Sequence, residues 1–440
     1  GLSISSGSTL QGTADILNGE TVSGSGSVNI TNYHSSTSAE LDTITTNGAT
    51  ITLSSSTSLS SSAKLPIPAD DSAVIITGSN TLTLGGTNNI GTNTSGLSIA
   101  SGSTNIGTAD ILNGETVSGG GSINVTDYHS SLSSVLSNIT TNGVTITLSS
   151  LTSLNSSARL PVPANNSAVI ITGNNTLTLG GTSNIGTNND GLSISSGSSL
   201  SGTADILNGK TVSGEGSVNV TNISSANVAL GNIITSTVTI TLPGSVTLHT
   251  STTLPIPASS GSVNITNISS SNVALNTIIA TTITITLSDN ITLNSSTRLP
   301  IPDSGGALII AGGNDYILTL GSTTNLGSSL SVNASTNVTG TANILNGEII
   351  SGSGSVNVTN YHSSTSSVLN TITTNGATIT LSSSTSLSSS ARLPIPANNS
   401  AVIITGSNTL ILGGSSIIGS NTNGLSISSG STLQGTADIL

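Results

Sequence analysis

The sequence contains no Cys, Met, Trp or Phe, and charged residues make up only 5% of its 440 positions. The absence of Cys excludes disulfides and thiolate metal sites. With 1% aromatic residues, the chain lacks the side chains that usually supply much of the buried area of a compact enzyme. Disorder is not expected either, because disordered chains combine low hydrophobicity with high charge density, whereas 33% of these residues are hydrophobic.

The charge that is present is mostly negative. There are 17 acidic and 5 basic residues, which gives a net charge of -12. Binding of nucleic acid needs clustered Lys and Arg to neutralise phosphates, and an anionic membrane surface likewise attracts basic segments. No apolar run reaches the roughly 18 residues of a membrane-spanning helix. We therefore expect no nucleic-acid partner and no membrane insertion.

The chain does contain a long internal repeat. The word Gly1-Leu2-Ser3-Ile4 recurs from Gly96, Gly191 and Gly424, with a weaker copy from Ser329, so the intervals are 95, 95, 138 and 95 residues. The long interval holds what looks like a tandem duplication. The predicted organisation is repeat 1 (1–95), repeat 2 (96–190), repeat 3 with a two-rung insertion (191–328), repeat 4 (329–423) and the start of a next super-repeat (424–440).

The insertion indicates the architecture. A fold that accepts extra residues between intact neighbours is quasi-one-dimensional, and segments such as 49–53 and 144–148 alternate apolar and hydroxyl side chains as strands do. The predicted fold class is all-β, a right-handed parallel β-solenoid of about 22–24 residues per rung, stacked into a rod roughly 90 Å long. Ile, Leu, Val and Ala are expected inside. Four turns or five turns would both divide a 95-residue repeat.

Two short words mark expected corners. Ten of the 11 prolines lie in five copies of Leu-Pro-(Ile/Val)-Pro, which begin at Leu65, Leu160, Leu254, Leu299 and Leu393. Proline within a paired strand loses a ladder bond, so these words predict extended corner segments with Leu and Ile pointing inward; the alternative is a Pro-rich ligand for a partner domain. The helix-like segment 13–17 stops at Asn18-Gly19, and we interpret it as strand and turn.

Long arrays of Ser/Thr/Asn/Gly-rich strands in near-identical repeats resemble the secreted β-solenoid proteins of bacterial surfaces, such as filamentous adhesins and autotransporter passengers. The resemblance covers the whole chain and rests on composition and repeat style. No site residue is carried over from it. It implies an extracellular or cell-surface location and a stalk, adhesin or filament role.

The carboxylates exchange freely between copies. Asp15 corresponds to Asn343, and Glu20 corresponds to Lys210. Paired acid–base catalysis needs fixed carboxylates, and calcium needs six to eight oxygen ligands with several carboxylates among them. We therefore predict that the protein is not an enzyme and has no catalytic residue, cofactor or metal site.

Three copies carry a Tyr-His-Ser-Ser word, and we consider its Tyr and His as contact-loop residues: Tyr33, His34, Tyr128, His129, Tyr361 and His362. One interpretation is a recognition knob whose aromatic face and imidazole contact glycan or a neighbouring filament. The favoured interpretation is a protruding loop whose Tyr shields a corner, since repeat 3 lacks the word. No acidic residue recurs nearby to orient the His for hydrolysis.

Four of the five basic residues precede the proline words: Lys64, Arg159, Arg298 and Arg392. The fifth copy has Thr253. These charges are candidates for side-by-side contacts between rods, and edge protection against aggregation is the equally plausible alternative.

Two further patterns have ordinary explanations. Thr-x-Thr words such as Thr50/Thr52 resemble the arrays of ice-binding proteins, but they occur about once per 95 residues, and strand alternation explains them. Sequons such as Asn29-Ile30-Thr31 are abundant, as this composition produces them by chance.

The predicted function is a structural extracellular filament or surface fibre. The alternative is an adhesin that binds glycan or a host surface through the Tyr-His loops, and the third is an ice-binding solenoid. The expected partner is the protein itself, through end-to-end or lateral assembly. Residues 1–17 are identical to residues 424–440, so we expect either a window on a longer molecule or a rod whose ends stack.

Overall fold

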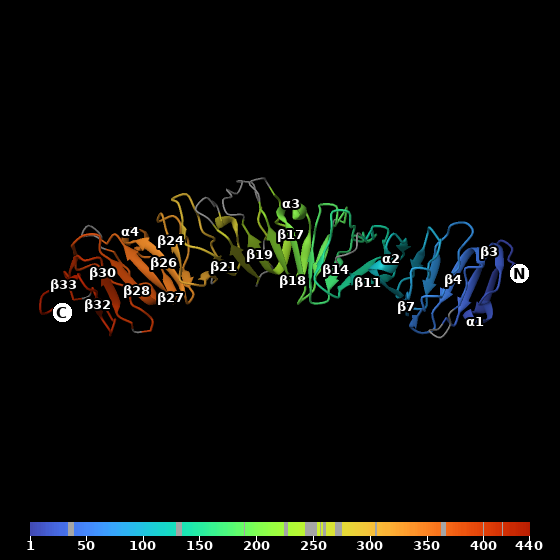
Figure 1. Ribbon diagram of the computed structural model, residues 1–440, viewed down its shortest axis with the longest axis horizontal. Coiled ribbons are helices and arrows are strands. Elements are labelled where there is room, and N and C mark those ends of the chain that lie inside the picture. Colours follow the sequence, from blue (N-terminus) through green and yellow to red (C-terminus); the bar gives the residue numbers. More distant parts are fainter. Residues whose placement is uncertain are drawn as a thin grey trace. The chain divides into compact units, whose positions relative to one another are not determined.

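The computed structural model is all-β and about 5% helical, with parallel strands stacked as a β-solenoid of about 18 turns (Figure 1). This confirms the predicted fold class. Two compact units divide the chain, residues 1–218 with 232–235 and residues 219–231 with 236–440. The structure describes residues 1–33, 39–128, 134–188, 190–223, 228–242, 253–255, 257, 261–268, 275–303, 306–361, 367–398, 400–415 and 417–440.

The elements up to residue 221 are β1 (Leu2–Ser3), β2 (Thr9–Thr13), α1 (Ala14–Leu17), β3 (Val22–Thr31), β4 (Ile44–Thr52), β5 (Thr57–Ser58), β6 (Val74–Thr77), β7 (Thr81–Thr83), β8 (Leu97–Ile99), β9 (Thr104–Thr108), α2 (Ala109–Leu112), β10 (Val117–Ser118), β11 (Ser122–Tyr128), β12 (Gly143–Leu148), β13 (Thr152–Ser153), β14 (Val169–Thr172), β15 (Thr176–Thr178), β16 (Leu192–Ile194), β17 (Ser199–Thr203), α3 (Ala204–Leu207) and β18 (Val212–Thr221).

The elements after residue 221 are β19 (Ile233–Thr241), β20 (Ser262–Thr266), η1 (Leu275–Thr277), β21 (Thr282–Leu287), β22 (Ile291–Thr292), β23 (Ala307–Gly312), β24 (Tyr316–Thr319), β25 (Leu330–Val332), β26 (Thr336–Thr341), α4 (Ala342–Leu345), β27 (Ile350–Thr359), β28 (Ile372–Thr380), β29 (Thr385–Ser386), β30 (Val402–Thr405), β31 (Thr409–Ile411), β32 (Leu425–Ile427) and β33 (Thr432–Gln434). Among the described residues, no helix has the length and apolar character needed to span a bilayer.

The strand register decides the number of turns in a repeat. Partners on successive turns of repeat 1 lie 20, 22, 25 and 23 residues apart: Leu2↔Val22, Val22↔Ile44, Thr50↔Ile75 and Val74↔Leu97. A 95-residue repeat therefore makes four turns, and the five-turn division is wrong. Figure 1 shows the parallel neighbours β3 and β4 side by side in the first unit.

The interior consists of aliphatic side chains stacked turn on turn. Val28 pairs with Leu10 on one side and with Ala49 on the other. Along β3 the side chains alternate, so that Val28 and Ile30 are buried while the residues between them are half-buried. Full burial of a Val, Leu or Ile side chain stabilises a fold by roughly 1.5–3 kcal/mol. The predicted aliphatic core is confirmed.

The segment 13–17 differs from our interpretation, because it contains one turn of α-helix, α1. The Thr13 hydroxyl accepts a hydrogen bond from the Ile16 N–H, and Ala14 and Leu17 are buried. A Ser/Thr N-cap satisfies an otherwise free backbone donor, and residues three apart share one helix face. The same Thr cap and buried pair recur in α2, α3 and α4.

The proline corners are only partly as expected. Leu65 is buried, as predicted, but Ile67 is half-buried and its equivalent Ile301 is 44% exposed. Pro66 and Pro68 are buried instead. The prediction that Ile points inward is wrong, because the second proline of the word occupies the inward position.

A buried asparagine closes a corner in three of the repeats. The Asn89 Oδ1 accepts hydrogen bonds from the Gly85 N–H (2.7 Å) and the Gly86 N–H (3.0 Å). Its Nδ2 donates to the Ser60 carbonyl at 2.9 Å and to the Ala63 carbonyl at 2.6 Å. One side chain therefore satisfies four backbone groups on two turns. Asn184 and Asn325 make the same set of contacts.

Replacing Asn89 by Ala should lower the free energy of unfolding by at least about 2 kcal/mol, because each buried polar group left without a partner costs about 1–3 kcal/mol. The exposed neighbour Asn88 provides the control, and Asn88→Ala should change stability by less than about 0.5 kcal/mol. Urea unfolding followed by circular dichroism measures both values. Equal stability of the two variants would contradict the role of the buried amide.

One buried asparagine has no such network. Asn105 in β9 is 0% exposed, its neighbours in the ladder are Leu82 and Ile123, and neither polar atom of its side chain has a hydrogen-bond partner in the structure. The same position is Leu10 in repeat 1 and Leu200 in repeat 3. In repeat 2, a side-chain amide without hydrogen-bond partners therefore lies in a stack of aliphatic side chains from successive turns.

Asn105→Leu should raise the free energy of unfolding by about 2 kcal/mol, because a buried amide without hydrogen bonds costs roughly 1–3 kcal/mol in proteins. The reciprocal change Leu200→Asn should lower it by a similar or larger amount. Both are measured by urea unfolding against the parent chain. A destabilising effect of Asn105→Leu would show that the amide is satisfied and that our account of this column is wrong.

Candidate functional site

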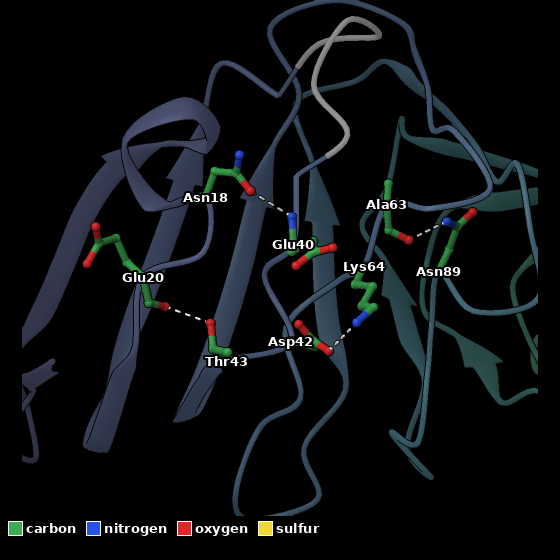
Figure 2. A network of polar contacts seen from close by, with 8 residues as sticks. All are labelled: Asn18, Glu20, Glu40, Asp42, Thr43, Ala63, Lys64 and Asn89. Atoms are coloured by element: carbon green, nitrogen blue, oxygen red, sulfur yellow. Dashed lines mark hydrogen bonds and ion pairs between the residues drawn. The ribbon is translucent and has the colours of Figure 1, made fainter.

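The basic position before the proline word lies at a corner, and Figure 2 shows this corner around Lys64. Lys64 forms an isolated parallel bridge with Glu40 on the preceding turn. Its Nζ donates to the Asp42 Oδ2 at 3.0 Å, and this hydrogen bond and the charge of Asp42 raise the pKa of Lys64. The side chains are 40% and 30% exposed. A surface pair of this kind contributes little to stability.

Side chains hold the backbone of this corner across three turns. The Asn18 Oδ1 accepts from the Glu40 N–H at 2.8 Å, and the Thr43 hydroxyl donates to the Glu20 carbonyl at 2.7 Å (Figure 2). The amide contact recurs in repeats 2 and 4, where Asn113 accepts from Val135 and Asn346 accepts from Val368. The corner that carries the basic residue therefore has the same fixed backbone in these repeats.

The three arginines at this position make different contacts from Lys64. The Arg159 Nη1 donates to the Ser156 and Ala158 carbonyls, both at 2.9 Å. Arg298 donates to Ser295 (3.1 Å) and Thr297 (3.3 Å), and Arg392 donates to Ser389 (2.9 Å) and Ala391 (2.8 Å). In each case one nitrogen of the guanidinium is anchored on the backbone of its own corner. Within the part of the chain that the structure describes, the only ion pair is Lys64–Asp42.

The basic position changes together with the acidic position on the turn before it. Where residue 42 is Asp, residue 64 is Lys; where the equivalent residue is Ser or Asn, the base is Arg; where it is Gly, the base is lost. The five pairs are Asp42/Lys64, Ser137/Arg159, Gly231/Thr253, Asn276/Arg298 and Asn370/Arg392. One copy thus has a corner whose base is neutralised by Asp42, three copies have an arginine anchored on the backbone, and one copy has no base.

The surface hollows are lined mostly by uncharged side chains. The hollow beside Lys64 has a volume of about 160 Å³ and is also lined by Asp42 and Ile67, below the roughly 300–1,000 Å³ of most small-ligand sites. Two others, of about 320 and 360 Å³, are open and lined only by Gly, Ser, Thr and Asn from three successive turns. A fourth hollow, of about 180 Å³, spans four turns and contains Asp315 as its single carboxylate. None of these hollows brings two carboxylates together.

The tyrosines of the Tyr-His word lie in the interior. Tyr33, Tyr128 and Tyr361 are each 0% exposed, and their hydroxyl groups have no hydrogen-bond partner in the structure. Burial raises the pKa of Tyr33 to about 12 and also raises the pKa of Tyr128 and of Tyr361. Buried rings do not fit the alternative interpretation, in which they present an aromatic face to a ligand, and they are compatible with the favoured one, in which the Tyr shields a corner. His34, His129 and His362 lie outside the described residues.

Repeat 3 shows what the tyrosine position requires. Ile223 and Ile268 follow the same Asn that precedes Tyr33, and they are 0% and 4% exposed. An aliphatic side chain therefore substitutes for the ring, and the word has not simply been deleted. The position needs buried volume, and a hydroxyl is not needed there.

The acidic side chains on the helical turns and just after them are exposed or half-buried. Asp15, Asp110 and Asp205 are exposed on the helical turns. Burial raises the pKa of Glu115 and of Glu348, while Lys210 at the same position donates to the Gly186 carbonyl at 2.8 Å. Among the described residues, no three His, Asp or Glu side chains gather to hold a metal ion. That the protein is not an enzyme stays a prediction.

The Thr-x-Thr words are part of the ladders between turns. The Thr52 hydroxyl donates to the Asn29 Oδ1 at 3.0 Å, and Thr50 has Ile75 as its partner on the next turn. Thr52 has Thr31 and Thr77 on the neighbouring turns, but Thr50 has Asn29 and Ile75, so the Thr-x-Thr pair is not repeated on either turn. The same Thr–Asn bond recurs at Thr147–Asn124, Thr241–Asn219, Thr286–Asn264 and Thr380–Asn357. These contacts favour a structural role for the words.

No family model, curated protein or solved structure matches this chain. Function must therefore be argued from its own surfaces. Sequence reasoning missed the corner asparagines, although the word Gly-Gly-x-x-Asn at Gly85 and Gly180 was a usable signal. It also missed the joint change of positions 42 and 64, which is visible once the contact between Lys64 and Asp42, 22 residues apart, is known.

Replacing Tyr33, Tyr128 and Tyr361 together by Phe should raise the free energy of unfolding by about 1 kcal/mol per site, because each change removes a buried hydroxyl without a partner. The variant should also resist alkali. The folded pKa of each Tyr exceeds its unfolded value near 10, so the parent chain loses up to about 1.4 kcal/mol per pH unit and per Tyr as pH rises above 10.

Unfolding by urea at pH 8 and at pH 11 measures both effects. We expect the stability difference between the variant and the parent to grow with pH. Two results would show that the hydroxyls have partners after all. One is a variant that is less stable than its parent at pH 8, and the other is a variant that loses as much stability above pH 10 as its parent does.

Proposed function

We propose that this protein is a structural component of an extracellular filament or surface fibre, built by stacking equivalent β-solenoid turns. The observation that carries the proposal is that the stack accepts extra turns without a change of register. In the second unit Thr237 pairs with Ser262, Ser262 with Thr282, and Thr282 with Ala307. The duplicated turns continue the ladder of strands. This is expected if the function of the protein depends on the length of the solenoid and not on a single binding or catalytic site.

The pattern of exchange between copies supports the same proposal. Equivalent buried positions remain filled by large side chains, as Tyr33 and Ile223 show, whereas the surface chemistry at equivalent corners changes from Glu20 to Lys210. A catalytic or ligand site needs the opposite pattern, with fixed polar groups. A scaffold needs only an interior that stacks.

The adhesin and ice-binding alternatives receive less support. The adhesin interpretation relied on the aromatic faces of Tyr33 and its equivalents, and these rings are buried. The ice-binding interpretation needs Thr-x-Thr on neighbouring turns, and Thr50 has Ile75 beside it. We propose the protein itself as its main partner.

Deleting residues 238–282 tests whether turns are interchangeable. The deletion joins Thr237 to Ile283, which recreates the junction between Thr282 and Ile283. We expect a folded chain with a melting temperature within about 4 °C of the parent, since a change of 1 kcal/mol shifts the melting temperature of a large domain by about 2–4 °C.

The matched control removes residues 238–281, one residue fewer. This leaves the side chains of the following strand on the wrong faces, because a slip of one residue reverses inside and outside. We expect this control to unfold or aggregate. Equal behaviour of the two deletions would contradict modular stacking.

The proposed location is tested on the cells that make the protein. Antibodies raised against the folded chain should label fibres outside the cell in thin-section electron micrographs. Cells lacking the gene are the control. Label confined to the cell interior would reject the filament proposal.

A further inference from the structure

We propose that Arg159, Arg298 and Arg392 are carboxylate-binding forks through which two copies of this chain bind side by side. The inference rests on the proposed structural function and names the residues of the contact. Each arginine is half-exposed, and the corners of Arg159 and Arg392 are held by parallel bridges to Val135 and Val368.

The guanidinium groups are oriented and only half used. In each arginine the Nη1 donates to two carbonyl groups of its own corner, as at Ser156 and Ala158 for Arg159. No described residue accepts a hydrogen bond from the Nη2 or Nε of Arg159. A guanidinium has five N–H donors in a planar fork that matches a carboxylate with two parallel bonds. Anchoring of Nη1 leaves one edge of the fork to receive such a group.

The corners of Arg159 and Arg392 lack the acid that neutralises Lys64. Asp42 is replaced by Ser137 and Asn370 at the equivalent positions. The chain has 17 acidic and 5 basic residues, so a second copy presents many carboxylates that such a guanidinium can bind. The exchange of Lys for Arg suits binding of an outside carboxylate, because Arg binds it with defined geometry whereas the Lys ammonium is a point charge.

The spacing of the forks matches that of the chain's own acids. Arg298 and Arg392 lie in the second unit, 94 residues and four turns apart, which is ~19 Å at the ~4.8 Å spacing of strands. The exposed carboxylates of Asp15, Asp110 and Asp205 recur every 95 residues in the first unit, which is the same interval of four turns. One matched pair between two copies therefore aligns the next pair.

Sedimentation velocity on the full chain tests the proposal. At about 10 mM salt, where screening is weak, the parent chain should associate as its concentration rises, and about 0.5 M salt should dissociate it. The triple variant Arg159→Gln, Arg298→Gln and Arg392→Gln should associate at least about tenfold more weakly, a difference of about 1.4 kcal/mol. Thermal unfolding by circular dichroism checks that the variant is folded.

Two matched variants separate the fork from charge in general. Lys64→Gln removes one positive charge that is already neutralised by Asp42, so association should stay within about twofold of the parent. Replacing the three arginines by Lys keeps the charge and loses the fork, so association should fall between the parent and the Gln variant.

Three outcomes would overturn the proposal. The first is a parent chain that stays monomeric at low salt up to about 100 μM. The second is association that the Gln variant does not weaken. The third is binding of polygalacturonate to the parent chain without self-association, which would assign the forks to an acidic polysaccharide. Failure of the filament proposal is distinct, because label inside the cell would leave association in solution measurable.

Discussion

Parallel, in-register stacking of turns is the constraint on which the rest of this structure depends. Each turn is covered by the next, so side chains at equivalent positions must fit one above another. Column positions such as Leu10, Val28 and Ala49 are therefore small or medium aliphatic residues. The near absence of aromatic residues follows from this, since a ring on one turn would need matching space on both neighbours. Among the described residues, Tyr33 and its two equivalents are the aromatic side chains that lie fully buried in the core.

The same constraint determines where polar and small residues lie. Successive turns approach so closely at Gly26 that a Cβ there would lie 2.5 Å from the Ser5 carbonyl oxygen and 2.6 Å from that of Ser8. Corner backbone groups that the ladder does not pair are satisfied from inside by Asn89. Charge is confined mainly to corners, where it can vary between copies without disturbing the stack. The side chain at the position of Lys64 and Arg159 can therefore differ between copies, and it can contact a molecule outside the chain.

The fold could be predicted because the repeats display its periods directly: strand alternation at 49–53 and an insertion of whole turns. The division of a repeat into four turns could not be predicted, because partners on adjacent turns lie 18 to 27 residues apart and share no fixed period. The inward proline and the Thr-capped helical turn depend on local backbone geometry at Pro68 and Thr13. The site was predicted as a set of residues, but the burial of Tyr33 depends on neighbouring turns that its word does not reveal.

Disulfide trapping tests the register most directly, since the chain has no Cys of its own. Thr50 and Ile75 are partners on adjacent turns, about 4.8 Å apart, within the ~4.4–6.8 Å separation that a disulfide needs. Four turns per repeat predict that Thr50→Cys/Ile75→Cys forms an intramolecular disulfide rapidly and without loss of structure. Five turns of about 19 residues would instead place Thr50 beside Ala69. Rapid oxidation of Thr50→Cys/Ala69→Cys, with none of Thr50→Cys/Ile75→Cys, would contradict this account.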